Sequence, residues 1–106
     1  MSPLHKRKLG LLLSTPPDTR NFRHGLNLAD AALAAGINVY LYCIDDAVLG
    51  LADPQLQELK HRGLNLYACA YGAQKRNIPA SELAVFSGLT MVSDIIAAAD
   101  RFVSFN

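Results

Sequence analysis

The sequence predicts an α/β protein with three layers, α/β/α, built on a mostly parallel sheet of about five strands in the flavodoxin-like class of topology. Strand-length apolar runs alternate with stretches of helical periodicity, and the joins between them are short. The first apolar run, residues 8–14, is continuous rather than alternating, which is typical of a strand covered on both faces. Parallel strands joined by right-handed helical crossovers satisfy both observations.

The first half of the chain predicts two strands with a helix between them. Thr15-Pro16-Pro17 ends the first strand, and either Asp18 or Thr19 can cap a helix that closes at Gly36. The β-branched and aromatic run 37–44 predicts the second strand. The buried stripe expected on the helix consists of Phe22, Leu26, Ala29 and Leu33.

The second half continues the alternation. Asp53-Pro54 is a capping residue followed by a first-turn proline, and it predicts a helix that ends at Gly63. Residues 64–69 predict the third strand, and a short helix follows Cys69. The remaining elements are a short strand over 83–86, a helix over 89–99 and a last strand over 100–105. The apolar stripe of that helix is Leu89, Val92 and Ile96, widened by Met91, Ile95 and Ala99.

Composition limits the class of function. A chain of 106 residues with 51% hydrophobic and 18% charged residues describes one folded domain, residues 1–106. The formal net charge of +1 and the scattered basic residues argue against a nucleic-acid-binding face. No apolar run approaches the roughly 20 residues that cross a bilayer. Two cysteines without a signal-peptide pattern predict a cytoplasmic protein whose thiols stay free.

Cys69 is the candidate catalytic residue. It ends a buried strand, and in a parallel α/β sheet the residues that end strands lie at the edge where ligands bind. The N–H groups and the dipole of the following helix, which starts after Ala70, favour an anion there, and the thiolate is the reactive form of cysteine. Tyr71 and Gly72 should shape access to the sulfur. The alternative is that Cys69 is a small buried apolar residue of the core.

Other chemistries fit the strand ends poorly. Pro16 and Pro17 offer no N–H groups to a phosphate, which argues against a dinucleotide site and leaves a small flavin-binding module as a weaker alternative. The histidines His5, His24 and His61 lie in separate segments without metal-ligand spacing, so we expect no metal and no bound cofactor. None of them is expected beside Cys69, which argues against hydrolysis by a cysteine–histidine pair.

The second cysteine, Cys43, also ends a strand and raises the question of a disulfide with Cys69. If Asn38 pairs with Asn65, then Tyr42 lies beside Cys69 and Cys43 points to the other face of the sheet. The expected role of Cys43 is therefore core packing.

Taken together, these residues resemble the DsrE/DsrF-like sulfur-relay family, in particular its TusD/DsrE type. The likeness spans essentially the whole chain, and residues 64–78 with the cysteine are its most specific part. Further parts of it are Thr15-Pro16, Ala34-Ala35-Gly36 before an aromatic strand, and the ending 99–105. The resemblance implies that Cys69 accepts a sulfane sulfur as a persulfide and passes it to a partner protein.

The resemblance also implies partners and an assembly. Sulfur donors and acceptors would be rhodanese-like proteins or TusA-like small carriers. Lys75 and Arg76 match basic residues of the family segment, and they either contact an acidic partner or serve as a charge pair at the end of a helix. A homo-oligomer, as trimer or hexamer, or a hetero-oligomer is expected. A protein of this kind without sulfur chemistry, serving as a structural subunit of such an oligomer, is the alternative function.

Overall fold

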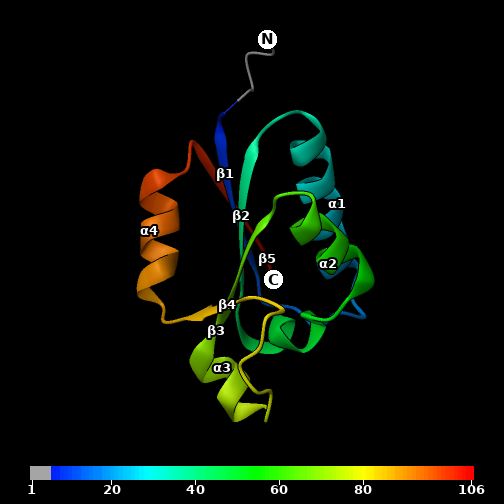
Figure 1. Cartoon of the computed structure of the whole chain (residues 1–106), viewed down its shortest axis with the longest axis vertical. Coiled ribbons are helices and arrows are strands. Elements are labelled where there is room, and N and C mark those ends of the chain that lie inside the picture. The colour runs from blue at the N-terminus through cyan, green and yellow to red at the C-terminus, as the bar shows by residue number, and fades with distance from the viewer. Residues whose placement is uncertain (1–5) are drawn as a thin grey trace.

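A sheet of five parallel strands runs through the molecule in the order β4-β3-β2-β1-β5 (Figure 1). The structure is a computed structural model, and it describes residues 6–106. The predicted α/β class and the parallel sheet of about five strands are confirmed. The strands are β1 (Lys8–Leu13), β2 (Asn38–Cys43), β3 (Asn65–Cys69), β4 (Val85–Ser87) and β5 (Arg101–Phe105).

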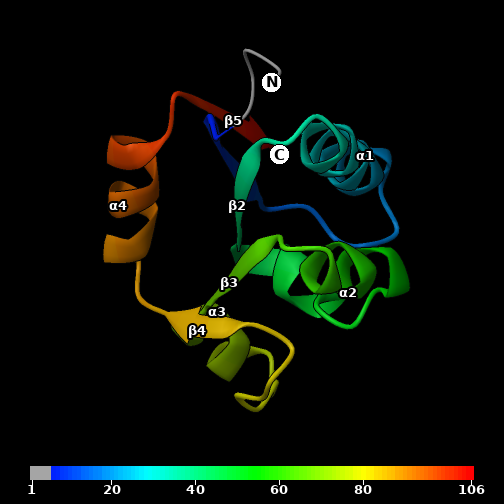
Figure 2. The same cartoon turned by 45° about the horizontal axis from the view of Figure 1, so that its top comes forward.

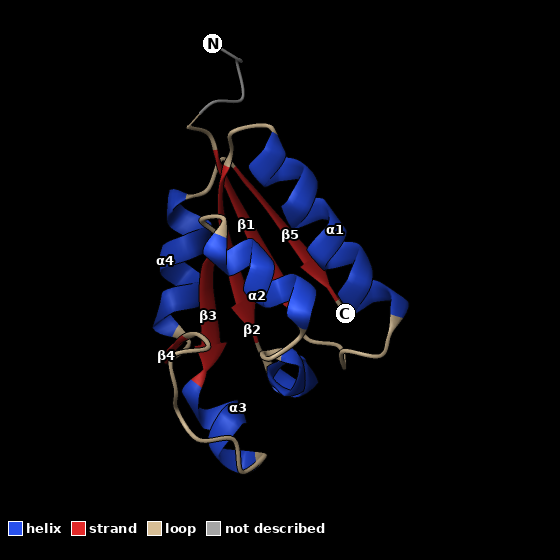
Figure 3. Cartoon of the chain, turned by 45° about the vertical axis from the view of Figure 1, so that its right-hand side comes forward, coloured by secondary structure: helices blue, strands red, loops and turns tan. Residues whose placement is uncertain are grey.

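Helices cover both faces of the sheet, which gives the predicted three layers (Figures 1 and 2). The chain steps from β1 to β4 in one direction, so its right-handed crossovers place α1 (Arg20–Ala34) and α2 (Pro54–His61) on the same face. The return from β4 to β5 at the opposite edge carries α4 (Thr90–Ala98) over the other face. Figure 3 shows α3 (Ala70–Lys75) beyond the carboxyl end of β3. A 3₁₀ helix, η1 (Asp45–Gly50), follows β2.

Most of the core lies between the sheet and the α1–α2 layer. Leu11 pairs with Leu41 and Leu13 with Cys43, so these side chains share one face, and Gly25 of α1 lies directly over Leu13. The apolar side chains that are fully buried here include Leu11, Leu13, Phe22, Leu26, Val39, Leu41, Cys43 and Leu56. Burial of this layer from water is the main stabilising contribution.

Capping side chains fix the starts of both helices in this layer. Thr19 accepts a hydrogen bond from the backbone N–H of Phe22, and Asp53 accepts from Gln55 and Leu56. Asp53 also pairs with Arg23 of α1 at 2.8 Å, which ties the two helices together. The hydrogen bond from Arg23 is the main reason that the pKa of Asp53 lies below its usual value.

The face under α4 is narrower and more aromatic. A Cβ atom at Gly10 of β1 would lie 2.7 Å from Ile95 of α4 and 2.7 Å from the ring of Phe102, so glycine is what allows α4 to approach the sheet. Strand alternation places a second set of side chains on this face, and it includes the last residue of β3. The set is Tyr40, Tyr42, Tyr67 and Cys69.

The expected apolar stripe of α4 is not the buried one. Ile95 is buried and Met91 and Val92 are half-buried, whereas Leu89 is 57% exposed and Ile96 is 51% exposed. The helix is apolar on most of its circumference, so periodicity alone did not identify the side that contacts Gly10 and Phe102. Within residues 6–106, no helix combines the length and the apolar character that crossing a membrane requires.

Candidate functional site at the end of strand β3

Cys69 is both the last residue of β3 and the N-cap of α3. Its Sγ atom accepts a hydrogen bond from the backbone N–H of Gly72 at 3.3 Å, which is the position that a serine or aspartate oxygen usually occupies at a helix start. The residue is 5% exposed. The sulfur is therefore in contact with a backbone N–H donor at the start of α3.

The glycine that donates to Cys69 also leaves space beside it. A Cβ atom at Gly72 would lie 3.6 Å from Sγ of Cys69 and 3.7 Å from the Nη1 atom of Arg76, which are ordinary van der Waals distances. Glycine therefore keeps one side of the sulfur free of a side chain without being required by the backbone. Ala70 and Tyr71, the other two residues expected to shape the site, are exposed on α3, and Tyr71 is 68% exposed.

The two basic residues of α3 have different surroundings. Arg76 donates to the Gly72 carbonyl at 3.1 Å and pairs with Asp46 of η1 at 3.0 Å, so it joins α3 to η1. Lys75 lies 5.4 Å from the centre of the Tyr71 ring and is exposed. The sequence placed Lys75 and Arg76 together, whereas the structure directs Arg76 inward and leaves Lys75 at the surface.

Tyr42 reaches the same place from the neighbouring strand. It is fully buried, and its hydroxyl lies 3.1 Å from the carbonyl oxygens of both Ser87 and Gly88, beyond β3. Burial raises the pKa of Tyr42 to about 12, contact with Ser87 lowers it, and the adjacent Cys69 sulfur raises it. Sequence reasoning assigned Tyr42 no function. A tyrosine in the middle of an apolar strand was the available signal, because a buried phenol needs a polar partner.

The expected strand register is wrong by two residues. Tyr40 rather than Asn38 pairs with Asn65, Tyr42 pairs with Tyr67, and Cys43 pairs with Ala68. The Asn65 side chain donates a hydrogen bond to the Val39 carbonyl of β2. Asn38 and Asn65 therefore do not lie opposite each other in the sheet. Because the error is an even number of residues, the faces are unchanged.

Cys43 therefore lies on the α1–α2 face, opposite to Cys69, and both thiols are free. Cys43 is fully buried, and this burial raises its pKa to about 12. Its surroundings are those of a core residue.

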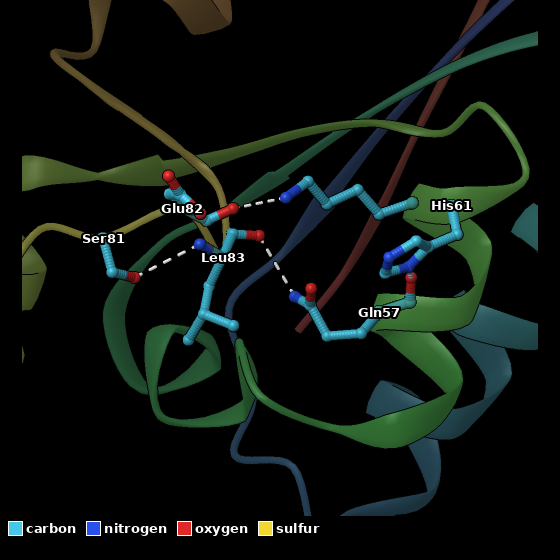
Figure 4. A pocket seen from close by; sticks show the side chains of 6 residues that line it. Gln57, His61, Ser81, Glu82 and Leu83 are labelled. Atoms are coloured by element: carbon cyan, nitrogen blue, oxygen red, sulfur yellow. Dashed lines mark hydrogen bonds between the residues drawn. The ribbon is translucent and has the colours of Figure 1, made fainter.

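A separate hollow of about 600 Å³ lies between α2 and the loop before β4 (Figure 4). Gln57 donates to the Leu83 carbonyl at 3.1 Å, and Lys60 donates to the Glu82 carbonyl. The Nδ1 atom of His61 donates to the Gln57 carbonyl at 2.7 Å. These polar groups hold the loop that leads to β4, and the residues that line the hollow do not include Cys69.

No metal site is found within residues 6–106, since no group of three or more His, Cys, Asp or Glu side chains comes together there. His24 lies on α1 and His61 on α2, away from Cys69, and His5 lies outside the described residues. The Thr15 hydroxyl next to the prolines is buried without a hydrogen-bond partner.

Comparison with known proteins finds a family and solved structures of similar fold. The model of the DsrE/DsrF-like family matches residues 7–105. The crystal structure of the ychN protein from E. coli superposes with a TM-score of 0.78 at 16% sequence identity, covering 94% of this chain and 99% of that one. No curated protein sequence matches. The structural likeness is a likeness of fold.

Proposed function

Because the chain belongs to the DsrE/DsrF-like family, and membership of this family implies a sulfur-relay role, we propose that it is a persulfide carrier with Cys69 as the sulfur-bearing residue. The single observation that carries this proposal is the position of the Cys69 sulfur at the end of β3, where it accepts the Gly72 N–H. Such a donor favours the anionic sulfur that both halves of a transfer require.

The loading step is an exchange between sulfur atoms. The Cys69 thiolate attacks the outer sulfur of a donor persulfide, R–S–SH, and a new sulfur–sulfur bond forms while the sulfur–sulfur bond of the donor breaks. The products are the Cys69 persulfide and the donor thiolate, R–S⁻, so no external oxidant or reductant is needed. Unloading repeats the exchange, with an acceptor thiolate as the nucleophile and Cys69 as the leaving thiolate.

Residues of α3 offer the surface for a partner that brings or removes sulfur. Tyr71 and Lys75 are exposed on α3, two and six residues after Cys69, whereas Arg76 is engaged with Asp46. We therefore assign partner contact to Lys75 and Tyr71, and assign Arg76 to holding α3 in place. The donor and acceptor would be rhodanese-like or TusA-like proteins, as the family resemblance implies.

The apolar surface around α4 supports an oligomer. Val85, Leu89 and Ile96 are each more than half exposed, and they lie on β4, at the start of α4 and along α4. Exposed aliphatic residues on neighbouring segments of the chain, here β4 and α4, are typical of a surface that pairs with another subunit. Sedimentation of the wild type against Ile96→Asp should show a smaller species for the variant.

A structural subunit without sulfur chemistry is the second candidate, and one observation favours it. Cys69 is only 5% exposed, so little of this residue is open to a partner or a reagent in the folded chain. Native thiol labelling separates the two functions. A carrier requires Cys69 to react in the folded protein, and a structural subunit requires it to react only after denaturation.

The deciding experiment is sulfur loading in three matched proteins. Reduced wild type, Cys69→Ser and Cys43→Ala are exposed under native conditions to glutathione persulfide and analysed by intact-protein mass spectrometry. Serine retains an oxygen that can cap α3, so Cys69→Ser should remain folded. The proposal predicts one added sulfur on wild type and on Cys43→Ala and none on Cys69→Ser. Equal loading of all three proteins, or of none, would contradict it.

A further inference from the structure

Tyr42 spans three strands on the face that carries Cys69. It starts on β2, its ring passes over β3, and its hydroxyl ends 3.1 Å from the carbonyl oxygens of Ser87 and Gly88 after β4. A phenol hydroxyl has one hydrogen to donate, so two acceptors at equal distance must share it. One of these hydrogen bonds is therefore always incomplete, and the hydroxyl can turn away from the pair at small cost.

Cys69 lies next to this hydroxyl. Its sulfur is close enough to raise the pKa of Tyr42, although burial of the phenol is the larger cause. Cys69 also pairs in register with Ser87, which places the two side chains side by side on the same face. The Ser87 Oγ atom is buried and has no hydrogen-bond partner. The sulfur is thus bordered by the Gly72 N–H, the Tyr42 hydroxyl and an unused Ser87 hydroxyl.

We infer that Tyr42 is a positioning residue for Cys69, whose hydroxyl turns from the Ser87 and Gly88 carbonyls to donate a hydrogen bond to the sulfur when that sulfur is anionic. The anion then has two donors from different elements, the backbone of α3 and the phenol of β2. For the persulfide form this inference rests on the proposed function, whereas for the thiolate it stands on the geometry alone. The Ser87 hydroxyl is free to donate to a carbonyl that Tyr42 vacates.

Other charged or titratable groups surround Cys69 and must be kept constant in a test of this inference. None of them is altered by removing the hydroxyl of Tyr42. On the elements packed against Cys69 they are Tyr40 on β2, Tyr67 on β3, Asp45 and Asp46 on η1, and Tyr71, Lys75 and Arg76 at α3.

The test compares Tyr42→Phe with Tyr40→Phe. Both tyrosines lie on β2 and face the same side, but Tyr40 pairs with Asn65, four residues before Cys69. The rate of iodoacetamide alkylation of Cys69, resolved by peptide mass spectrometry, is measured as a function of pH. Loss of a hydrogen bond to an anion disfavours the anion, so Tyr42→Phe should shift the profile to higher pH and slow alkylation at pH 7 roughly tenfold. Tyr40→Phe should reproduce the wild-type profile.

Coincident profiles for Tyr42→Phe and wild type would overturn the inference, as would an equal shift in Tyr40→Phe. Loss of stability alone does not imitate the expected result, because local opening accelerates alkylation rather than moving its pH dependence upward. Alkylation needs no sulfur donor. If wild type fails to load sulfur, the proposed carrier function is wrong. The alkylation profiles still decide whether the Tyr42 hydroxyl acts on the Cys69 sulfur.

A measurement on the wild type covers the case in which Tyr42→Phe does not fold. With carbon-13 in the tyrosine rings, the Cζ resonance of Tyr42 is followed while Cys69 is titrated, with thiolate formation read from its ultraviolet absorbance. The resonance should move as the thiolate absorbance of Cys69 appears, while burial, which raises the pKa of Tyr42, keeps the phenol itself protonated. A resonance that stays still through thiolate formation would overturn the inference.

Discussion

Cys43 and Cys69 end neighbouring strands of the same sheet, yet their surroundings differ in almost every respect. Cys43 faces the α1–α2 layer, is fully buried, and has its pKa raised by that burial to about 12. Cys69 faces the other side, caps α3 and accepts the Gly72 N–H. The difference teaches that ending a strand is insufficient for chemistry, and that the face of the sheet and the next residues of the chain decide what the thiol can do.

The largest expected effect is in native alkylation of the two thiols in wild type. At pH 8 the pKa of Cys43 leaves roughly a thousandfold less thiolate than an ordinary cysteine has, and its burial adds the need for local opening. Cys69 should therefore react with iodoacetamide at least about a hundredfold faster, as peptide mass spectrometry would measure. Similar alkylation rates for Cys43 and Cys69 would contradict the difference between their surroundings.

Truncation should cost far more in the core layer under α1 and α2 than on the exposed side of α4. Leu41→Ala removes a fully buried side chain next to Cys43, and the cavity should cost about 2–5 kcal/mol of unfolding free energy. Ile96→Ala trims a side chain on α4 that is 51% exposed, and under conditions that keep the chain monomeric it should cost less than about 0.5 kcal/mol. Urea unfolding monitored by circular dichroism compares them, and equal losses would contradict this picture.

In the α1–α2 layer, Asp53 stabilises the fold in a pH-dependent way, through its ion pair with Arg23 and its cap of α2. Its pKa is lowered in the folded protein, so its stabilising contribution is present above a pH of about 4 and is lost as the pH falls through the folded value. Asp53→Ala should cost about 1–2 kcal/mol at pH 7, mainly through the helix cap, because the 42% exposed Arg23 side chain leaves the ion pair screened by water.

Urea unfolding of wild type and Asp53→Ala is measured at pH 7 and at pH 2. The difference in unfolding free energy between the two proteins should be smaller at pH 2. The control is Asp30→Ala, which removes an exposed pair with Arg62 and should change stability by less than about 0.5 kcal/mol. A difference between wild type and Asp53→Ala that is larger at pH 2 would contradict a stabilising role of the ionised Asp53 carboxylate.

The smallest expected effect sharpens the account of Cys69. Gly72→Ala would place a methyl carbon 3.6 Å from Sγ without a steric clash. It should slow alkylation of Cys69 about threefold, while raising helix stability by roughly 0.5–1 kcal/mol because glycine is a poor helix former. Stability and reactivity therefore move in opposite directions. Unchanged alkylation by a bulky maleimide would show that reagents do not approach the sulfur past Gly72.

Much of the fold could be predicted because local signals were strong. Thr19, Asp53-Pro54 and Gly36 mark helix ends by side-chain capping and by a positive φ of 83° at Gly36, which are properties of a few adjacent residues. The continuous apolar run of β1 reflected a strand covered on both faces. The opposite orientation of Cys43 and Cys69 followed from side-chain alternation, even though the register was off by two residues.

What could not be predicted depends on contacts between distant segments. The buried side of α4 is set by Gly10 and Phe102, which lie far away in sequence. The pairing of Arg76 with Asp46 depends on η1 packing against α3, and the hydroxyl of Tyr42 meets Ser87 only because β3 separates β2 from β4. Each of these needs the strand order before the residues involved can be named.

The most direct test of the central claim uses the unmutated protein. Wild type is loaded with glutathione persulfide under native conditions, the persulfides are capped, and the tryptic peptides 24–60 and 63–75, which hold one cysteine each, are quantified by mass spectrometry. The account predicts that the added sulfur is found on Cys69 in peptide 63–75 and that Cys43 carries essentially none. Sulfur divided equally between the two peptides, or found mainly on Cys43, would contradict it.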